Sequence, residues 1–336
     1  MYQIYLLNKI SPVGLEVLPK ESYQTTDKLE NPHAILVRSA DMHSMDFPSS
    51  VEAIARAGSG VNNIPLEKCA EKGIVVFNTP GANANGVKEL AITGMLLASR
   101  KIVEGINWAK SLDGQGDKVP DLVEKGKSDF VGPEIKGKKL GVVGLGAIGV
   151  MVANAAQALG MEVIGFDPFI SVQAAWGLSS SVKKANNLDQ IFTQCDYISL
   201  HVPSNKDTKF MINKTSLAKT KKGVRIINLS RADLVKDADL KEGLESGIVA
   251  AYVTDFPNQE LLNMKGVIPV PHLGASTPES EDNCAVMAAE QVRDYLENGN
   301  IKNSVNFPEC DLGRCSSKAR ITVLHKNIPN ILAQML

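Results

Sequence analysis

Three residues that can move a proton or hold a carboxylate stand at or near the ends of predicted strands in the second half of the chain. They are Arg231 in INLSRADLV, Glu260 in TDFPNQELL and His272 in PVPHLGAST. Oxidising an alcohol by hydride transfer requires a base for the hydroxyl proton and a cation for a carboxylate on the substrate. A histidine titrates near neutrality, and a carboxylate on its second ring nitrogen raises its pKa and fixes its tautomer. A structural histidine beside a proline, and an arginine paired with a neighbouring acid, would also fit these residues.

A glycine-rich stretch supplies the cofactor site that such chemistry needs. Residues 138–168, KKLGVVGLGAIGVMVANAAQALGMEVIGFDP, follow the order strand, glycine turn, helix, strand and acid of a dinucleotide-binding βαβ unit. Gly144 allows a tight turn, Gly146 admits a pyrophosphate to the backbone, and Gly149 lets the helix pack on the strand. Asp167 can bind an adenosine ribose and repel a 2′-phosphate, which favours NAD over NADP. Glycines alone would equally fit a turn that binds nothing.

The composition is typical of a soluble globular protein that acts on a small molecule. The 336 residues suffice for two domains, at roughly 100–200 residues a domain. Lys plus Arg number 36 against 37 Asp plus Glu, so no net field attracts nucleic acid or an anionic membrane. The five cysteines are scattered without a C-x-x-C pair, which favours reduced thiols in the cytoplasm over a disulfide framework or a metal site. We find no signal peptide and no apolar run that would span a bilayer.

Short apolar runs alternate with helical patterns, which predicts α/β architecture with parallel sheets. The predicted strands are residues 3–7, 34–37, 53–56, 74–77, 140–143, 163–166, 197–201, 224–229, 249–253 and 267–270. Ligands of doubly wound sheets bind beyond the carboxyl ends of the strands. We therefore expect the loops after the early strands to line one crevice, although ordinary connecting loops are the alternative.

Two predicted long helices divide the chain into domains. Residues 82–112 carry a helical stripe with small members, and residues 113–138 read as an irregular surface excursion. The second helix follows Thr277, a plausible N-cap, and ends at Gly299. We predict a discontinuous substrate domain, residues 1–98 and 275–312, with a dinucleotide-binding domain, residues 99–274, inserted in it. The cleft between the two is the expected active site.

Several long motifs follow one another in order over essentially the whole chain. They are RAGSGVNNIPLEKCAEKGIVVFNTPGANANGVKEL, GPEIKGKKLGVVGLGAIGVMVANAAQALGMEVIGFDP, INLSRADLV, the acid pair of TDFPNQE, and PHLGAST. Together they resemble the D-isomer-specific 2-hydroxyacid dehydrogenase family. The resemblance implies an NAD-binding Rossmann domain inserted in a flavodoxin-like substrate domain, and a homodimer. It also implies NAD-dependent oxidation of 3-phospho-D-glycerate to 3-phosphooxypyruvate, on the way to L-serine.

The family pattern implies a role for each residue of the expected site. Arg231 would bind the substrate carboxylate, His272 would be the acid/base, and Glu260 would pair with His272. The residues implied to hold the cofactor are Thr79, Gly144, Gly146, Ala147, Ile148, Asp167, Val202, Leu229, Ser230, Arg231, Asp255, His272 and Gly274, with Asp255 near the nicotinamide carboxamide. Those implied to contact the substrate are Arg38, Ser39, Ser59, Gly60, Val61, Asn83, Arg231 and His272.

The sequence departs from the family pattern in three places. Ala232 follows the expected catalytic arginine where glycine is usual, and Ala40 stands where some members that use phosphoglycerate carry a second arginine. The segment between Glu260 and His272 is also short for the family. These departures leave phosphate recognition open, with Lys88 either a ligand or an ordinary solvated lysine.

The last residues, 318–336, resemble the opening strand and helix of an ACT regulatory domain, with His325 and Asn327 at effector positions. The other strands of such a domain do not follow, so we expect a truncated ACT-like segment and weak or absent inhibition by serine.

Two other functions remain open from the sequence. One is a sister dehydrogenase acting on glyoxylate, hydroxypyruvate or D-lactate. The other is an NAD(H)-sensing binding protein of the corepressor type, which would need no turnover.

Overall fold

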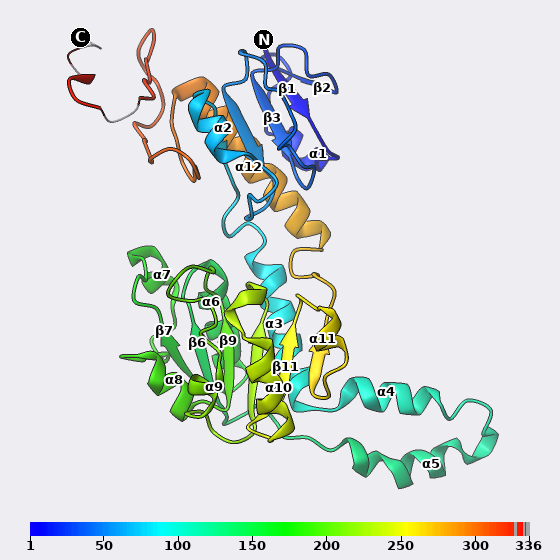
Figure 1. Ribbon diagram of the computed structural model, residues 1–336. Helices are drawn as coiled ribbons and strands as arrows, with labels where there is room; N and C mark the ends of the chain where they lie inside the picture. The colour runs from blue at the N-terminus through cyan, green and yellow to red at the C-terminus, as the bar shows by residue number, and fades with distance from the viewer. Residues whose placement is uncertain (326–327, 332, 334–336) are drawn as a thin grey trace. The chain divides into compact units, whose positions relative to one another are not determined.

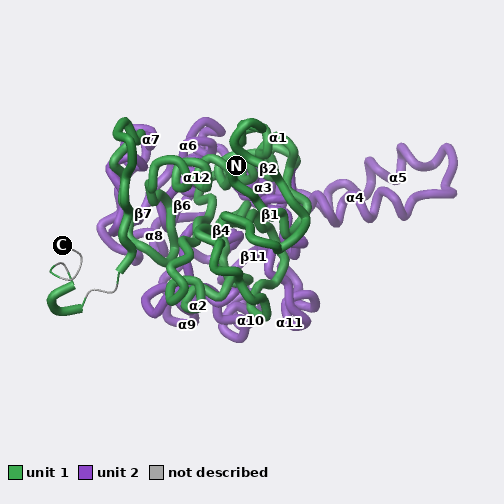
Figure 2. The backbone as a smooth tube through the Cα atoms, turned by 90° about the horizontal axis from the view of Figure 1, so that it is seen from above, with its two compact units in different colours: residues 1–83, 278–336 green, residues 84–277 purple. Residues whose placement is uncertain are grey.

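The computed structural model describes residues 1–325, 328–331 and 333, and the chain forms two compact units. The first comprises Met1–Asn83 and the segment from Pro278 onward, and the second comprises Ala84–Thr277; Figure 2 colours them separately. The second unit therefore interrupts the sequence of the first. Each unit is built on its own parallel sheet with helices on both faces, which confirms the predicted α/β class.

A five-stranded parallel sheet, in the order β2-β1-β3-β4-β5, forms the centre of the first unit (Figure 1). The elements are β1 (Tyr2–Leu6), α1 (Pro12–Leu15), β2 (Tyr23–Thr26), β3 (Ala34–Val37), β4 (Ala53–Arg56), α2 (Leu66–Glu71), β5 (Val75–Phe77) and α12 (Pro278–Asn298). This is the flavodoxin-like strand order. The sequence did not predict β2, because this edge strand buries only its tyrosine and so lacks an apolar run.

Successive residues of the central strands enter different cores on the two faces of this sheet. Ala34 and Leu36 of β3 belong to a core that also contains alanines of α12, whereas Ile35 and Val37 belong to the opposite core. Side chains alternate along a strand, so a strand covered on both faces reads as a continuous apolar run. Small side chains on the α12 side, such as Ala55, let that helix lie close to β4.

The second unit contains a seven-stranded sheet in the order β12-β11-β10-β9-β6-β7-β8, and every neighbouring pair is parallel. Its strands are β6 (Lys139–Val143), β7 (Glu162–Phe166), β8 (Lys183–Lys184), β9 (Tyr197–Leu200), β10 (Val224–Asn228), β11 (Val249–Thr254) and β12 (Val267–Pro269). Its helices are α3 (Ala84–Ser99), α6 (Ala147–Ala158), α7 (Val172–Gly177), α8 (Leu188–Gln194), α9 (Lys214–Leu217), η3 (Ala232–Leu234), α10 (Asp237–Glu245) and α11 (Gln259–Leu262). The order is that of a Rossmann sheet with one further strand at its edge.

Helix α3 belongs to the second unit, whereas the predicted domain boundary lay at residue 98. The helix packs against α6, β10 and β11, and Val87, Ala91 and Met95 are part of the core of this unit. At Gly94 a Cβ atom would lie 3.0 Å from Val253 of β11. The absence of a side chain there brings α3 close to the sheet, which explains why the helix groups with the second unit.

Between α3 and β6 the chain leaves the second unit as an arm, visible in Figure 1. The arm consists of α4 (Ile102–Lys110), η1 (Gly116–Lys118), α5 (Val119–Gly126) and η2 (Lys127–Phe130). The structure thus breaks the predicted long helix before α4 and forms a helix inside the predicted irregular excursion. Pro120 misled the prediction, because proline is tolerated in the first turn of a helix. Neither α4 nor α5 contains a buried residue.

The predicted ACT-like segment is not confirmed. Residues 318–325 contain no strand, and Asn327 lies outside the described residues. Arg320 instead ties this segment to the end of α12, since its Nη1 donates to the carbonyl oxygens of Asn298 and Gly313, each at 2.8 Å. Among the described residues, no helix is both long and apolar enough to cross a membrane.

Candidate active site

The predicted site residues of the second unit follow the carboxyl ends of neighbouring strands. Across the sheet from β12 to β7, the residues just beyond the strand ends are His272, Asp255, Arg231, Val202, Gly144 and Asp167. The parallel strands all end at the same edge of the sheet. The fold therefore gathers proton-transfer and anion-binding side chains at one end of this edge and the glycine turn at the other.

The three glycines of the turn are required for different reasons. A Cβ atom at Gly144, where φ is +89°, would collide with the carbonyl oxygen of His201, and one at Gly149 would collide with the carbonyl oxygen of Gly144. At Gly146, in contrast, no atom lies within 4 Å of the Cβ position. Gly144 and Gly149 therefore serve the packing of the turn, whereas Gly146 leaves open space in front of the backbone.

The start of α6 fits a dinucleotide phosphate. Gly146 is the N-cap and no side chain caps the helix, so its first amides and the positive end of its dipole can bind an anion. Asp167 accepts hydrogen bonds from the amides of Leu145, at 2.8 Å to Oδ2, and of Phe169, at 2.8 Å to Oδ1. The acid thus lies next to the glycine turn, where a ribose joined to the bound phosphate would reach it.

Arg231 is held by its backbone and exposed at its side chain. The buried Asn228 donates from Nδ2 to the carbonyl oxygen of Arg231, at 2.9 Å, and Ser230 donates from Oγ to the carbonyl oxygen of Leu200, at 2.7 Å. Arg231 Nη1 donates to the carbonyl oxygen of Ser230 at 2.6 Å. The guanidinium is therefore positioned at the strand end, and its remaining donors can bind an anion such as a carboxylate.

His272 lies next to a buried acid. Its Nδ1 is 3.8 Å from Oδ2 of Asp255, and the side chains are 69% and 2% exposed respectively. The ring also makes an edge contact with Phe256, with centroids 5.1 Å apart. Burial raises the pKa of the Asp255 carboxyl, and the positive charges of His272 and Arg231 act in the opposite direction. The imidazole thus has an acid on one side and solvent on the other, as an acid/base requires.

The acid that the structure places nearest His272 is Asp255, and the predicted pairing of His272 with Glu260 stays a prediction. Glu260 is exposed on the short helix α11. Asn258 caps this helix by accepting from the amide of Leu261 at 2.9 Å, and Leu261 is buried in the core. These contacts fix α11 in place, and they determine where Glu260 can lie. The sequence included Asp255 in the site, but its pairing could not be read from the motif.

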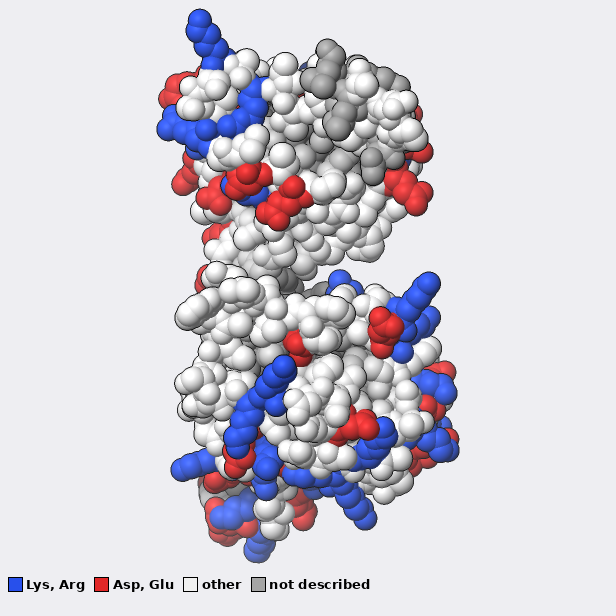
Figure 3. Space-filling view, turned by 90° about the vertical axis from the view of Figure 1, so that its left-hand side faces the viewer, with Lys and Arg blue, Asp and Glu red and all other residues white. Residues whose placement is uncertain are grey.

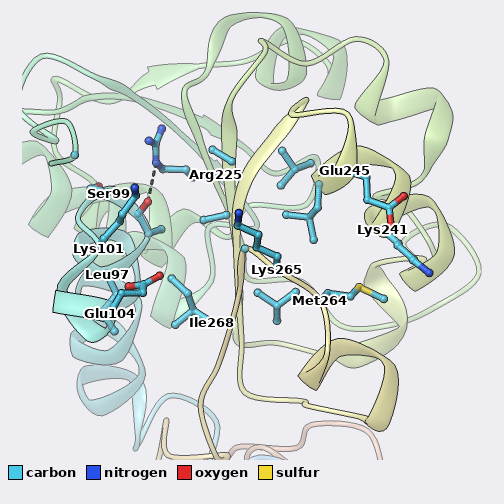
Figure 4. A pocket seen from close by; sticks show the side chains of 18 of the residues that line it. Leu97, Ser99, Lys101, Glu104, Arg225, Lys241, Glu245, Met264, Lys265 and Ile268 are labelled. Atoms are coloured by element: carbon cyan, nitrogen blue, oxygen red, sulfur yellow. Dashed lines mark hydrogen bonds between the residues drawn. The ribbon is translucent and has the colours of Figure 1, made fainter. Parts of the chain in front are cut away.

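A groove of about 1280 Å³ lies elsewhere in the second unit, with Glu260 on its wall and neither Arg231 nor His272 among its lining residues. In Figure 4, Lys101 and Glu104 stand on one side of the groove and Lys241 and Glu245 on the other, and Met264 and Ile268 lie between them. Arg225 lines one end and donates from Nε to the carbonyl oxygen of Ala98 at 2.8 Å. The groove therefore has charged rims and partly apolar walls, and it is separate from the strand-end site.

The remaining predicted residues lie in the first unit. Arg38 and Ser39 follow β3, Ser59 to Val61 follow β4, and Thr79 to Asn83 follow β5. Arg38 forms an ion pair with Glu281 of α12, at 2.7 Å. Asn8 is a further residue of this region that the sequence analysis did not include. Its Oδ1 accepts hydrogen bonds from the backbone amides of Arg38, Ser39 and Ala40 at 3.0–3.2 Å and so holds the loop after β3. Asn8 follows β1 closely, so its place after a predicted strand was the signal that could have identified it.

Comparisons with known proteins agree with this geometry. Residues 92–274 match the family model of the D-isomer specific 2-hydroxyacid dehydrogenase, NAD binding domain. The chain is 32% identical, over 92% of its length, to the D-3-phosphoglycerate dehydrogenase of Bacillus subtilis, and 33% identical, over 99% of its length, to that of Methanocaldococcus jannaschii. It spans 59% and 63% of the lengths of these two relatives.

The fold is also similar to those of two solved dehydrogenase and reductase structures. An NAD+-bound 3-phosphoglycerate dehydrogenase of Entamoeba histolytica superposes with a TM-score of 0.70 at 27% identity, covering 91% of this chain and 99% of that one. A glyoxylate reductase of Paecilomyes thermophila has a TM-score of 0.73 at 26% identity, covering 90% of this chain and 98% of that one.

Proposed function

The chain belongs to the D-isomer-specific 2-hydroxyacid dehydrogenases, and we propose that it oxidises 3-phospho-D-glycerate to 3-phosphooxypyruvate with NAD, the first step of the phosphorylated route to L-serine. The observation that carries this proposal is the row of His272, Asp255 and Arg231 beyond adjacent strands of a sheet that also carries the glycine turn. The choice of substrate is supported by the phosphoglycerate dehydrogenases that match over most of the chain.

The proposed roles follow from residue chemistry. His272 accepts the proton of the substrate hydroxyl, and its exposure lets it pass that proton to solvent. Arg231 binds the substrate carboxylate and polarises the reacting oxygen, because a planar guanidinium can donate to both. NAD, when bound, supplies the acceptor of the hydride. From the first unit, we propose that Arg38, Ser39, Ser59, Gly60, Val61 and Asn83 contact the substrate.

The cofactor contacts are proposed on the same basis. The start of α6, with Gly144, Gly146, Ala147 and Ile148, binds the pyrophosphate, and Asp167 binds the adenosine ribose. The other proposed contacts are Thr79, Val202, Leu229, Ser230, Arg231, Asp255, His272 and Gly274. The carboxylate of Asp167 would repel a 2′-phosphate, so we expect NAD to be preferred over NADP.

A small molecule is the proposed partner, and the surface is consistent with this. On the face drawn in Figure 3, Lys and Arg side chains are interspersed with Asp and Glu. The chain as a whole carries a formal net charge of −1. On this face the two signs of charge alternate, which gives a polyanion such as a nucleic acid little net attraction there.

We also propose a homodimer formed through the second unit. Ile102, Val103 and Ile106 of the arm are 41%, 44% and 49% exposed, and isolated helices as short as α4 and α5 are marginal without packing. The groove of Figure 4 lies on the same unit and has apolar walls that could receive such side chains. In a two-fold symmetric dimer, the arm of each copy would lie in the groove of the other. The apolar side chains of the arm and the apolar walls of the groove would then be buried twice, once in each direction.

A substrate panel tests the proposed activity. We expect NADH formation from 3-phospho-D-glycerate and NAD at a kcat/KM at least tenfold above that for D-lactate or D-glycerate. If the protein does not oxidise phosphoglycerate but readily reduces glyoxylate or hydroxypyruvate, it is instead a sister dehydrogenase of the same family.

A His272→Ala variant tests the role of the residue. It should lose turnover and keep most of its affinity for NAD, and undiminished turnover would exclude His272 as the base. If the wild-type chain binds NAD but turns over none of these acids, the corepressor-type function becomes the better proposal.

A further inference from the structure

The loops that follow β9 and β10 are joined by a hydrogen bond between two side chains. Ser204 donates from Oγ to Oδ2 of Asp233 at 2.6 Å, and both residues are partly buried. Ser204 lies shortly after the end of β9, and Asp233 lies in η3, shortly after the end of β10. A hydroxyl that donates to a carboxylate makes a short bond that is stronger than one between neutral groups. The bond therefore holds these two loops at a fixed separation.

Each of the joined loops carries one side of the proposed reaction centre. Val202, just before Ser204, is a proposed cofactor contact, and Arg231, just before Asp233, is the proposed anchor of the substrate carboxylate. Arg231 leads directly into the single turn of η3, so a shift of Asp233 would also move the backbone of Arg231. Since β9 and β10 are neighbours in the sheet, the spacing of the loops sets the separation between the cofactor contact and the anchor.

Backbone contacts continue the connection further along both loops. Phe210 donates from its amide to the carbonyl oxygen of Asp233 at 2.8 Å, and Ile212 donates to that of Leu234 at 3.0 Å. Phe210 has a φ of +53°, a left-handed conformation that is unfavourable for a bulky residue and persists where surrounding contacts hold it. Asp233 therefore holds the first loop twice, through its side chain at Ser204 and through its backbone at Phe210.

The loop after β9 also has hydrogen bonds of its own. Asn205 Oδ1 accepts from the amide of Thr208 at 3.1 Å, and Thr208 Oγ1 donates to the carbonyl oxygen of Pro203 at 2.6 Å. These contacts do not involve the Ser204 side chain. Removing the bond between Ser204 and Asp233 should therefore let the loop shift as a unit and leave its internal fold intact.

We propose that Ser204 and Asp233 are a pair of positioning residues, which hold the two loops at the separation that hydride transfer requires. They act through Val202 on the cofactor side and through Arg231 on the substrate side. Reacting atoms must come within about 3.5 Å of each other, and a displacement of about 1 Å can lower a rate about 100-fold. This proposal rests on the proposed dehydrogenase function.

Four substitutions separate the hydrogen bond from the charge of Asp233. Ser204→Ala and Asp233→Ala remove the bond, whereas Ser204→Thr and Asp233→Asn keep a donor and an acceptor. We expect each alanine variant to lower kcat for phosphoglycerate oxidation about tenfold. KM for the acid should stay within about threefold, because the guanidinium of Arg231 remains. Ser204→Thr and Asp233→Asn should keep kcat within about threefold of the wild type.

The double variant Ser204→Ala with Asp233→Ala tests whether the two residues act as one unit. Its kcat should be no lower than that of either single variant, because the same bond is lost in all three. Losses that multiply in the double variant would overturn the proposal. It would also be overturned by a normal kcat in Ser204→Ala together with equal losses in Asp233→Asn and Asp233→Ala, since only the charge would then matter.

Two further measurements do not depend on turnover. Hydrogen exchange at the amides of Phe210 and Ile212 reports the opening of the connection between the loops, and calorimetric titration reports the affinity for NAD. In Ser204→Ala we expect faster exchange at both amides and a Kd for NAD about threefold higher or more, because the freed loop must be ordered when the cofactor binds. Ser246→Ala, which removes a hydroxyl bond to the carbonyl oxygen of Glu242, is the matched control and should change neither quantity.

The outcomes for the pair and for the proposed function can be told apart. Exchange, NAD affinity and kcat that all equal the wild-type values in Ser204→Ala would overturn the positioning role, while the activity of the wild type would stand. If the wild type oxidises none of the acids, but Ser204→Ala still shows faster exchange and weaker NAD binding, the proposed function fails and the connection between the loops is supported.

Discussion

Asp167 Oδ2 accepts a hydrogen bond from the amide of Leu145 at 2.8 Å, across 22 residues of sequence. This contact joins the acid at the end of β7 to the glycine turn at the end of β6. The other oxygen, Oδ1, accepts from the amide of Phe169 at 2.8 Å. The oxygens of Asp167 therefore hold the glycine turn, and we propose that its charge also selects the ribose.

Replacing Asp167 should affect both the choice of cofactor and the stability of the turn. For Asp167→Ser we expect NAD affinity to fall about tenfold or more, equivalent to at least about 1.4 kcal/mol, and the ratio of NADP to NAD affinity to rise. The melting temperature without cofactor should also fall, because two amides lose a charged acceptor. Calorimetric titration and thermal melts measure both effects, with Asp207→Ser in an exposed loop as the control. An unchanged NADP to NAD ratio would remove Asp167 from the ribose site.

Substitutions at two glycines of the turn should have different effects, one on the stability of the fold and the other on cofactor binding. Gly144→Ala places a side chain at φ +89° against the carbonyl of His201, so the free energy of unfolding should fall by more than about 1 kcal/mol. Gly146→Ala places its methyl group in open space, so the protein without cofactor should lose less than about 1 kcal/mol. We still expect Gly146→Ala to weaken NAD binding at least tenfold. Normal NAD affinity in Gly146→Ala would mean that the pyrophosphate binds elsewhere.

His201 should make the protein less stable in mild acid. Burial lowers the pKa of His201 to about 4, whereas an unfolded histidine titrates near 6.5. In the folded state His201 binds a proton only at a lower pH than in the unfolded state. Its neutral form therefore contributes fully to the free energy of unfolding above pH 6.5, and this contribution is lost as the pH falls towards 4. Between pH 7 and pH 5 the free energy of unfolding should fall by about 2 kcal/mol from this residue.

Urea unfolding of His201→Gln checks this prediction. The variant should show a weaker dependence of unfolding free energy on pH in this range, and glutamine can keep a hydrogen bond to Ser199, which His201 Nε2 contacts at 2.8 Å. His43→Gln, at an exposed histidine, is the control and should leave the dependence nearly unchanged. Equal pH dependence in His201→Gln and wild type would show that His201 is not the group responsible.

The arm should determine the quaternary state. The double variant Val103→Asp with Ile106→Asp introduces charges on its exposed apolar side chains, and burying those charges in a partner groove would be costly. Light scattering coupled to size exclusion should give twice the chain mass for the wild type and the mass of one chain for the variant. Asn107→Asp with Ala109→Asp adds the same number of carboxylates elsewhere on α4 and should remain a dimer. A monomeric wild type would contradict the proposal directly.

The central strands could be predicted because they are buried on both faces, and this burial gives a run of consecutive apolar residues in the sequence. Residues 34–37, for example, are apolar at every position, since the two faces of β3 enter separate cores. The edge strands β2 and β8 were missed, because only one face or neither is buried there and no apolar run results. The arm was only partly predicted: the predicted helix covered α4, whereas α5 was missed because its proline was taken as a sign of irregular structure, although proline is tolerated in the first turn of a helix.

The sequence by itself determined the central strands and the polar or glycine residues at their ends. The glycine turn, Asp167, Arg231 and His272 each depend on a few adjacent residues, so a local pattern is enough to identify them. Only the tertiary structure decided which side chains became neighbours. Sheet order placed Asp255 beside His272, and the anchoring of α11 by Asn258 and Leu261 put Glu260 on the wall of the groove. Such proximity depends on long-range packing, which no local spacing of residues encodes.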